Sequence, residues 1–288
     1  MRSESEMMEL ILSAAREDDR VRAVVLGGSR ADPGAKRDLF QDYDILFLVR
    51  SVEPFLRTPR WVDRFGSRVI MQTPEAMSFY SPIGDGRFTY LMQFEDGNRI
   101  DLTLFPADEF SRYPGDSLSV ALLDKDGLLS SLPPASDRSY HVRRPEPSHF
   151  ADCCNEFLWV APYVAKGLWR DEPTYAKGHL DQVLHPALLQ MLSWRAGALT
   201  GFSVSTGKMG KHLRRYLPPE EWRMLMETGC SYAAGDIWRA LFCSAALFGR
   251  AGRETASALG FCYPEEEERR VIAFLRRVQA LPPDAAEL

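Results

Sequence analysis

Two short apolar strands near the start of the chain constrain the fold more than any other feature, because each carries small or polar residues at one end. The first, at residues 21–26, runs into the small-residue turn at 27–29. The second, at 43–50, opens on Asp42 and Asp44. Strand side chains alternate, so both carboxylates are expected on one face. Because neighbouring carboxylates repel each other, more so when buried, the pair favours a divalent-cation site facing the turn.

A third acid, Asp101, interrupts another apolar strand at residues 98–105, the return arm of a hairpin predicted from residues 87–105. If that strand lies beside the one at 43–50, three carboxylates converge. Such hard oxygen ligands suit Mg²⁺ bound to phosphates, and two such ions support in-line displacement at phosphorus. The backbone N–H groups at Gly28 and Ser29, and the Ser29 hydroxyl, are expected to bind the departing phosphates.

The pattern of secondary structure changes midway along the chain. Residues 1–135 mix strands with helices, which predicts an α+β domain built on a mixed sheet with flanking helices. Residues 136–147 include basic and proline-rich sequence typical of a linker. Residues 148–288 read as long helices, which predicts an all-α bundle. One of these helices is expected over 173–200, with an interruption or kink at Pro186. A cleft between the two domains is the expected ligand site.

Composition restricts where in the cell the protein is expected and which classes of molecule it is expected to bind. The chain has 288 residues, enough for one large or two modest domains. It has no apolar run of membrane-spanning length, no signal-peptide core and five cysteines without a C-x-x-C pair. We therefore expect a reduced cytoplasmic monomer that does not bind membranes. The net charge of −5 disfavours nucleic acid and suits a cationic ligand.

Two of the few lysines stand close together. Lys208 and Lys211 lie three residues apart at the start of a helix predicted over 207–216, so they are expected on one helical face. Positive charge at a helix start favours an anion site. The alternative is a solvated, charged turn.

A helix predicted over residues 148–170 carries candidates for binding a cationic acceptor. Asp152, Glu156 and Trp159 are spaced to share one face. Tyr163 and Asp181 are further candidates. The alternative is that Trp159 and Tyr163 pack in the core and that Asp181 is a surface acid.

At this point the sequence resembles a known family. The Gly28-Ser29 turn followed by Asp42-x-Asp44 is similar to the signature of nucleotidyltransferases with a DNA-polymerase-β-like core. The wider pattern resembles the aminoglycoside 6-adenylyltransferases, which modify streptomycin, over nearly the whole chain. The matching segments are residues 23–30, 40–44, 101–104, 154–160, 163–170 and 200–203.

The resemblance implies Mg²⁺-dependent transfer of AMP from ATP to the 6-hydroxyl of streptomycin, with release of pyrophosphate and antibiotic resistance as the result. It implies that Asp42 and Asp44 hold the metal and that Asp101 completes the site as ligand or general base. Glu95, close by in the hairpin, is the second candidate for that base and is also expected to contact the substrate.

The resemblance also implies nucleotide contacts outside the carboxylates. Ser29 and Arg30 are expected to contact the triphosphate. The family places a basic helix over the ATP phosphates, which assigns Lys208 and Lys211 to the same task.

Two other functions compete with this one. One is a nucleotidyltransferase that acts on a protein or RNA; the lack of a basic stripe interleaved with aromatic residues argues against RNA. The other is a nucleotide-binding module without catalysis. The presence of all three carboxylates argues against that module.

Overall fold

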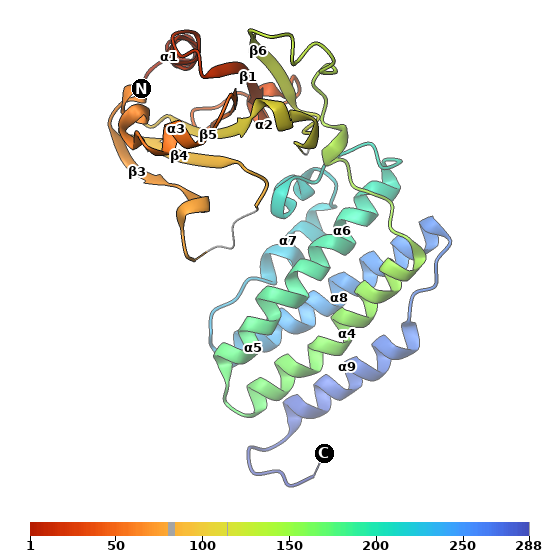
Figure 1. The fold of residues 1–288 in the computed structure, drawn as a ribbon. Coiled ribbons are helices and arrows are strands. Elements are labelled where there is room, and N and C mark those ends of the chain that lie inside the picture. Colours follow the sequence, from red (N-terminus) through yellow and green to blue (C-terminus); the bar gives the residue numbers. More distant parts are fainter. Residues whose placement is uncertain (80–83, 114, 288) are drawn as a thin grey trace. The chain divides into compact units, whose positions relative to one another are not determined.

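The computed structural model describes residues 1–79, 84–113 and 115–287, and the chain divides into two compact units (Figure 1). Met1–Ser139 combines a sheet with helices, and Tyr140–Leu288 is helical. The predicted fold class, a mixed sheet with flanking helices followed by an all-α region, is confirmed.

A six-stranded sheet organises the first unit, with strand order β3-β4-β5-β2-β1-β6. The two central strands, β2 and β5, run parallel, and the other neighbouring strands are antiparallel. The sheet is therefore mixed, as predicted. Its strands are β1 (Val21–Gly27), β2 (Tyr43–Val49), β3 (Arg68–Gln72), β4 (Phe88–Phe94), β5 (Arg99–Pro106) and β6 (Ser119–Asp124).

One face of the sheet is covered. Helix α1 (Glu4–Arg16) begins at a capping box, in which Ser3 and Glu6 satisfy each other's backbone N–H groups. Its buried Met7 and Ile11 join a core with alternate residues of the strands, such as Phe47. The short helix α3 (Glu53–Leu56) and the 3-10 turns Pro59–Phe65, Pro74–Ala76 and Ala107–Arg112 complete the unit around the sheet.

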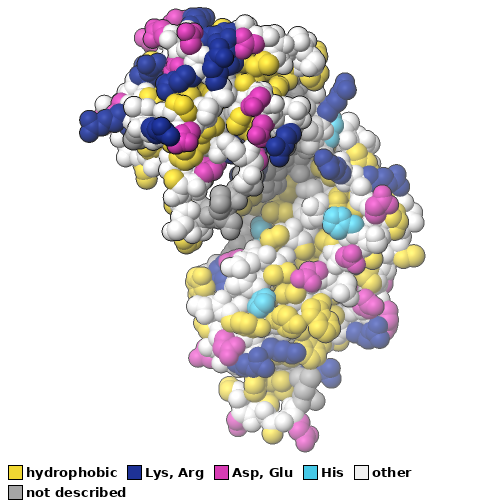
Figure 2. Space-filling view, in the orientation of Figure 1, with side chains coloured by type: hydrophobic (Ala, Val, Ile, Leu, Met, Phe, Trp, Pro, Cys, Tyr) yellow, Lys and Arg dark blue, Asp and Glu magenta, His cyan; other side chains and the backbone are white. Residues whose placement is uncertain are grey.

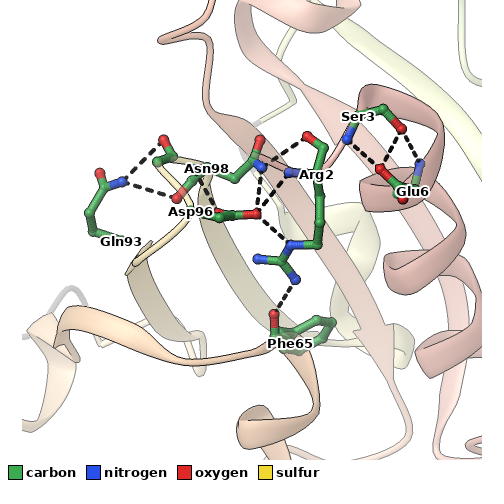
Figure 3. Close-up of polar contacts among 8 residues, drawn as sticks. Arg2, Ser3, Glu6, Phe65, Gln93, Asp96 and Asn98 are labelled. Carbon is green, nitrogen blue, oxygen red and sulfur yellow. Dashed lines mark hydrogen bonds and ion pairs between the residues drawn. The ribbon is translucent and has the colours of Figure 1, made fainter.

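The N-terminus is tied to the β4–β5 hairpin turn (Figure 3). Arg2 Nε donates to Asp96 Oδ2 at 2.6 Å, and Asn98 Nδ2 donates to the Arg2 carbonyl oxygen at 3.1 Å. The Arg2 guanidinium also holds the pKa of Asp96 well below its usual range. The hairpin that presents Asp101 is thus anchored from the helical side of the sheet.

The opposite face of the sheet holds the predicted acids. Since side chains alternate, Asp44 and Asp101 point away from the core that α1 covers. Both are half-buried. Farther along the same face, Leu46 and Phe105 belong to a smaller apolar cluster.

The second unit is built from long helices that share one apolar core. Helix α4 packs against α5, α8 and α9, and α8 packs against α6 and α7 (Figure 1). The helices are α4 (Pro147–Trp169), α5 (Pro173–His179), α6 (His185–Leu199), α7 (Pro219–Glu227), α8 (Ala234–Leu259) and α9 (Glu265–Ala280).

Two predicted helices of this unit differ in the structure. The helix expected over 173–200 contains a π-helical turn, Leu180–Leu184, just before Pro186. A proline ring clashes with the preceding turn of a regular α-helix, which explains the irregular turn there. The prediction of a helix over residues 207–216 is wrong. The structure has two 3-10 turns there, Lys208–Gly210 and Leu213–Arg215, because Gly207 and Met209 take positive φ angles of 72° and 55°.

No helix within the described part of the chain combines the length and apolarity that crossing a membrane needs.

Candidate active site

The two parallel strands bring the predicted carboxylates together. Asp44 on β2 and Asp101 on β5 are register partners, and Asp42 directly precedes β2. The strand with Asp101 does lie beside the strand with Asp44, which meets the condition for the three carboxylates to converge. Residues 57 positions apart in the chain therefore form one acidic site on the face opposite α1, where 101 − 44 gives the separation.

Arg99 is the counter-ion of these acids. Its Nε donates to Asp101 Oδ1 at 2.7 Å, and its Nη2 donates to Asp101 Oδ2 at 2.7 Å. The same Nε lies 3.7 Å from Asp42 Oδ2. One guanidinium thus partly neutralises two of the three carboxylates, and its pKa is raised chiefly by the hydrogen bonds to Asp101.

Asp44 receives the least compensation. Burial, followed by the negative charges of Asp101 and Asp42, raises the pKa of Asp44 to about 6. Burial also raises the pKa of Asp42, although Arg99 opposes that shift. The site therefore favours an added positive charge next to Asp44.

The glycine turn is built against Asp44. Gly27 is the register partner of Asp44, and the short helix α2 (Gly28–Ala31) begins at the next residue. Gly28 has a φ of 62°, and a Cβ there would lie 1.9 Å from Asp44 Oδ2. Only glycine lets this backbone approach the carboxylate without displacing it.

Arg30 is placed differently from the prediction that it contacts phosphate. Its guanidinium lies 3.8 Å from the centre of the Tyr43 ring, and Nη2 donates to the Gln41 carbonyl oxygen at 2.9 Å. The Arg30 side chain is 8% exposed. Arg30 therefore holds the backbone on either side of Asp42 and offers little free surface to a phosphate.

Gln41 links the turn to the acidic strand. Its Nε2 lies 3.4 Å from both the carbonyl oxygen and the Oγ of Ser29. Its Oε1 is buried and has no hydrogen-bond partner within the described residues. The residue before Asp42 is thus connected to the turn at Ser29, with an unused polar atom beside the turn.

Glu95 does not join the three aspartates. It is exposed in the turn after β4 and lines a shallow concavity with Met1, Arg2, Glu6, Gly66, Ser67 and Asp96. Asp42, Asp44 and Asp101 are not among the residues that line this concavity. Asp101, in register with Asp44, stays the first candidate for the group that meets an acceptor hydroxyl, and Glu95 stays the second.

Lys208 and Lys211 lack the structural setting that was predicted for them. Both are exposed, Lys208 within a 3-10 turn and Lys211 just after it. With no helix at residues 207–216, the anion site expected at its start is absent. The contact of the two lysines with the ATP phosphates therefore stays a prediction, without the helix start on which the sequence argument rested.

The acceptor candidates on α4 lie along one exposed face of that helix. Asp152, Glu156 and Trp159 are exposed, and Trp159 retains 62% of its accessible surface. The Trp159 indole N–H donates to the Tyr163 hydroxyl at 2.8 Å. Trp159 is therefore not a core residue. Figure 2 shows hydrophobic side chains exposed among acidic and histidine side chains on the visible face of this unit.

Asp181 has a local partner. It lies exposed in the π-helical turn, where Lys177 Nζ approaches its Oδ2 at 2.6 Å. Lys177 also lies 5.5 Å from the centre of the Tyr232 ring. Asp181 is thus already neutralised, which makes it a weaker candidate for binding a cation than Glu156.

Three residues near the acids were missed from the sequence: Gln41, Glu75 and Arg99. Arg99 could have been found, because it lies two residues before Asp101 in the same strand and so shares its face. Gln41 carried no pattern that points to the Ser29 contact. Glu75 accepts hydrogen bonds from Thr89, a contact across the end of the sheet that no local spacing predicts.

The chemistry of the donors fits a divalent cation. Within residues 1–79, 84–113 and 115–287, no group of three Asp, Glu, His or Cys side chains already forms a metal-binding arrangement. The Arg99 guanidinium instead supplies positive charge to Asp42 and Asp101. Carboxylate oxygens, together with the raised pKa of Asp44, match what Mg²⁺ would bind and neutralise.

Comparison with known proteins gives consistent matches. The profile of the family described as Streptomycin adenylyltransferase matches residues 1–278. An aminoglycoside 6-adenylyltransferase from Bacillus subtilis is 41% identical over 93% of this chain and 95% of its own length. One from Campylobacter jejuni is 39% identical over 93% of this chain and 93% of its own length.

A solved structure is also similar. It is the crystal structure of an aminoglycoside 6-adenyltransferase from Bacillus subtilis, with 37% sequence identity and a TM-score of 0.48. The match covers 98% of this chain and 100% of that chain. The family assignment rests on the sequence matches.

Proposed function

The chain belongs to the Streptomycin adenylyltransferase family, and from this we propose that it transfers AMP from ATP to the 6-hydroxyl of streptomycin in a Mg²⁺-dependent reaction. The coarser part of this statement, an enzyme that adenylylates an aminoglycoside, follows from the relatives. Streptomycin, ATP and Mg²⁺ are the finer parts that the experiment below tests. Antibiotic resistance is the expected consequence.

The observation that carries the proposal is the pairing of Asp44 with Asp101 beside the Gly28 turn. A phosphate needs hydrogen-bond donors, and a reacting phosphorus centre needs positive charge nearby. The backbone N–H groups of the turn can supply the hydrogen-bond donors. The carboxylates can supply the positive charge by holding a cation. A nucleotide-binding module would not need three acids at this point.

The reaction has a simple balance. The acceptor hydroxyl oxygen forms a bond to the α-phosphorus of ATP, the bond from that phosphorus to the bridging oxygen breaks, and pyrophosphate leaves. The hydroxyl proton must pass to a base. In the proposal Asp101 accepts it or orients the hydroxyl, since each of its oxygens keeps a lone pair beyond the bond to Arg99.

The protein groups around the nucleotide have separate tasks. Asp42, Asp44 and Asp101 would hold Mg²⁺, which when bound offsets negative charge on the phosphates and favours ionisation of the acceptor hydroxyl. Backbone N–H groups at Gly28 and Ser29 would orient the leaving phosphates. Arg30, packed on Tyr43, keeps the segment with Asp42 in place.

The acceptor surface that we propose on the helical unit is the exposed face of α4. Its acids, Asp152 and Glu156, suit the guanidinium groups of streptomycin. Trp159 presents a flat apolar ring, fixed through its bond to Tyr163, against which a cation or a sugar can pack.

The test is transfer of labelled AMP from ATP to a panel of aminoglycosides with Mg²⁺, and again with excess EDTA. We expect labelled streptomycin only when Mg²⁺ is present. Asp44→Asn should reduce the rate by about a thousandfold or more, because a metal-holding charge is lost at the reacting phosphate.

Asp108→Asn is the matched control, since Asp108 is an exposed acid on the same unit. It should leave the rate unchanged. Transfer to other aminoglycosides but not to streptomycin would contradict the proposed acceptor. Full activity in EDTA, or in Asp44→Asn, would contradict the metal assignment.

A further inference from the structure

The edge of β4 carries a carboxylate that the mechanism above does not use. Strand β3 stops pairing with β4 at Gln72, opposite Leu91, and the chain then turns at Pro74–Ala76. From that turn, Glu75 accepts hydrogen bonds from the Thr89 backbone N–H at 2.9 Å and from the Thr89 hydroxyl at 3.1 Å. Glu75 thus caps the open edge of β4 with a carboxylate in a defined position.

This carboxylate belongs to the same face of the sheet as the catalytic acids. Thr89 is the register partner of Thr103 on β5, and their hydroxyl oxygens are 3.3 Å apart. Thr103 lies two residues after Asp101, so both side chains leave the strand on one face, about 7 Å apart along it. Glu75, Thr89 and Thr103 therefore form a polar group next to Asp101.

The charge of Glu75 is only partly offset within the part of the chain that the structure describes, by the electrostatic interaction with Arg87. It takes part in no ion pair there, and Arg87, the nearby cation, is bound through two nitrogens to Asp85. Glu75 is nevertheless half-buried. A half-buried carboxylate without an ion pair favours a cationic ligand, and capping β4 would need only hydrogen bonds, not charge.

We propose that Glu75 binds an ammonium or guanidinium group of the aminoglycoside, with the hydroxyls of Thr89 and Thr103 beside it available to sugar hydroxyls. The inference rests on the proposed function and adds a specificity residue on the sheet-containing unit. Aminoglycosides carry several cationic groups among their hydroxyls. A cation held at Glu75 would direct a neighbouring hydroxyl of the same molecule toward Asp101.

Two variants of Glu75 separate charge from structure. Glu75→Gln can keep both hydrogen bonds, because its amide accepts from the Thr89 N–H and can donate to the Thr89 hydroxyl, but it removes the charge. Glu75→Asp keeps the charge and, being shorter, weakens both bonds. The full-length protein is used throughout, with Glu53→Gln as control, since Glu53 is 61% exposed on the same unit.

The measurements are the steady-state KM values for streptomycin and ATP, the affinity for streptomycin by calorimetry without ATP, and the melting temperature. We expect Glu75→Gln to weaken streptomycin binding roughly ten- to hundredfold and to change the KM for ATP by less than about twofold. Glu75→Asp should bind streptomycin better than Glu75→Gln while melting at a lower temperature.

The opposite order would overturn the inference. If Glu75→Gln binds streptomycin as the wild type does, Glu75 only caps β4. If both variants lose streptomycin and ATP affinity in proportion to their loss of melting temperature, the effect is structural and the inference again fails. Failure of the proposed function is distinct, because then the wild-type protein itself neither binds nor modifies streptomycin.

Discussion

At the scale of single residues, Asp44 combines the features expected of a metal-holding group. It is half-buried beside two other carboxylates, and Arg99 is bound to Asp101 rather than to it. Its pKa of about 6 means that the free, folded protein binds a proton there more tightly than the unfolded chain does. The stability that this proton provides is therefore present at low pH and is lost as the pH rises through about 6.

Asp44→Asn should therefore stabilise the metal-free protein, and more so at higher pH. The amide imitates the protonated acid at every pH, so its advantage over the wild type should be about 2 kcal/mol larger at about pH 7.5 than at about pH 4.5. Urea unfolding in EDTA at the two pH values measures it. A stability gain of equal size at both pH values would show that the surroundings do not disfavour the ionised Asp44 carboxylate. The control variant Asp108→Asn should show no such pH dependence.

Arginine roles at this scale were only partly predictable. Arg30 was predicted to contact the triphosphate because it follows the glycine turn. In the structure its guanidinium packs on the Tyr43 ring and so has a structural role. Arg99 was not marked, although it is the cation nearest to Asp101. Long side chains can reach partners in many directions, so tertiary contacts decide which partner they take.

At the scale of elements, the backbone conformation at the start of α2 determines how closely the turn approaches the Asp44 carboxylate. Gly27 and Gly28 are adjacent, yet only Gly28 has a positive φ and lies against Asp44. At Gly27 an added Cβ would meet its nearest atoms at 3.7 Å, an ordinary contact. The two glycines therefore form a matched pair for testing the turn.

Gly28→Ala should cost about 1–3 kcal/mol of unfolding free energy and should lower the AMP-transfer rate, since the new methyl group displaces the Asp44 carboxylate. Gly27→Ala should be close to wild type in both. Chemical denaturation and the labelled-ATP assay check the pair. Equal losses in the two variants would mean that the approach of Gly28 to Asp44 has no special importance.

The exposed face of α4 offers a second test at this scale. Trp159→Leu should raise the KM for streptomycin about five- to twentyfold with little change in the KM for ATP, because the leucine removes the ring that packs against the cation. Met226→Ala on α7 is the control, since Met226 is also exposed, at 54%. An unchanged KM for streptomycin in Trp159→Leu would remove α4 from the acceptor site.

Most elements were predicted within one or two residues, for a physical reason. Strand β4 has one face in the apolar core and so alternates between buried and half-buried residues, whereas β1 and β2 are nearly continuous apolar runs. The helix at 207–216 failed because its glycines at 207 and 210 both take positive φ, which a helical pattern of apolar residues does not reveal. The π-turn before Pro186 was anticipated only as a break or kink.

At the scale of the whole molecule, each unit has a core of its own, and the described chemistry of the acids lies within the sheet-containing unit. The helical unit also buries charge: Glu221 is fully buried and is paired with Arg195 and Arg250. Such a network is costly to break, because removing one partner leaves a buried charge unpaired. It gives the helical unit an internal polar anchor that has no part in the proposed reaction.

Sequence alone was sufficient to identify the chemical motifs, which are a glycine turn, the Asp42-x-Asp44 pair and a lone Asp101. It was also sufficient to identify the family that they indicate. These features are local, since turns, alternation and short motifs depend on neighbouring residues. Tertiary structure decided the rest. Only the parallel pairing of β2 with β5 puts Asp101 beside Asp44, and only the packed sheet edge brings Glu75 to Thr89, because both contacts join segments that are distant in the chain and are formed by folding.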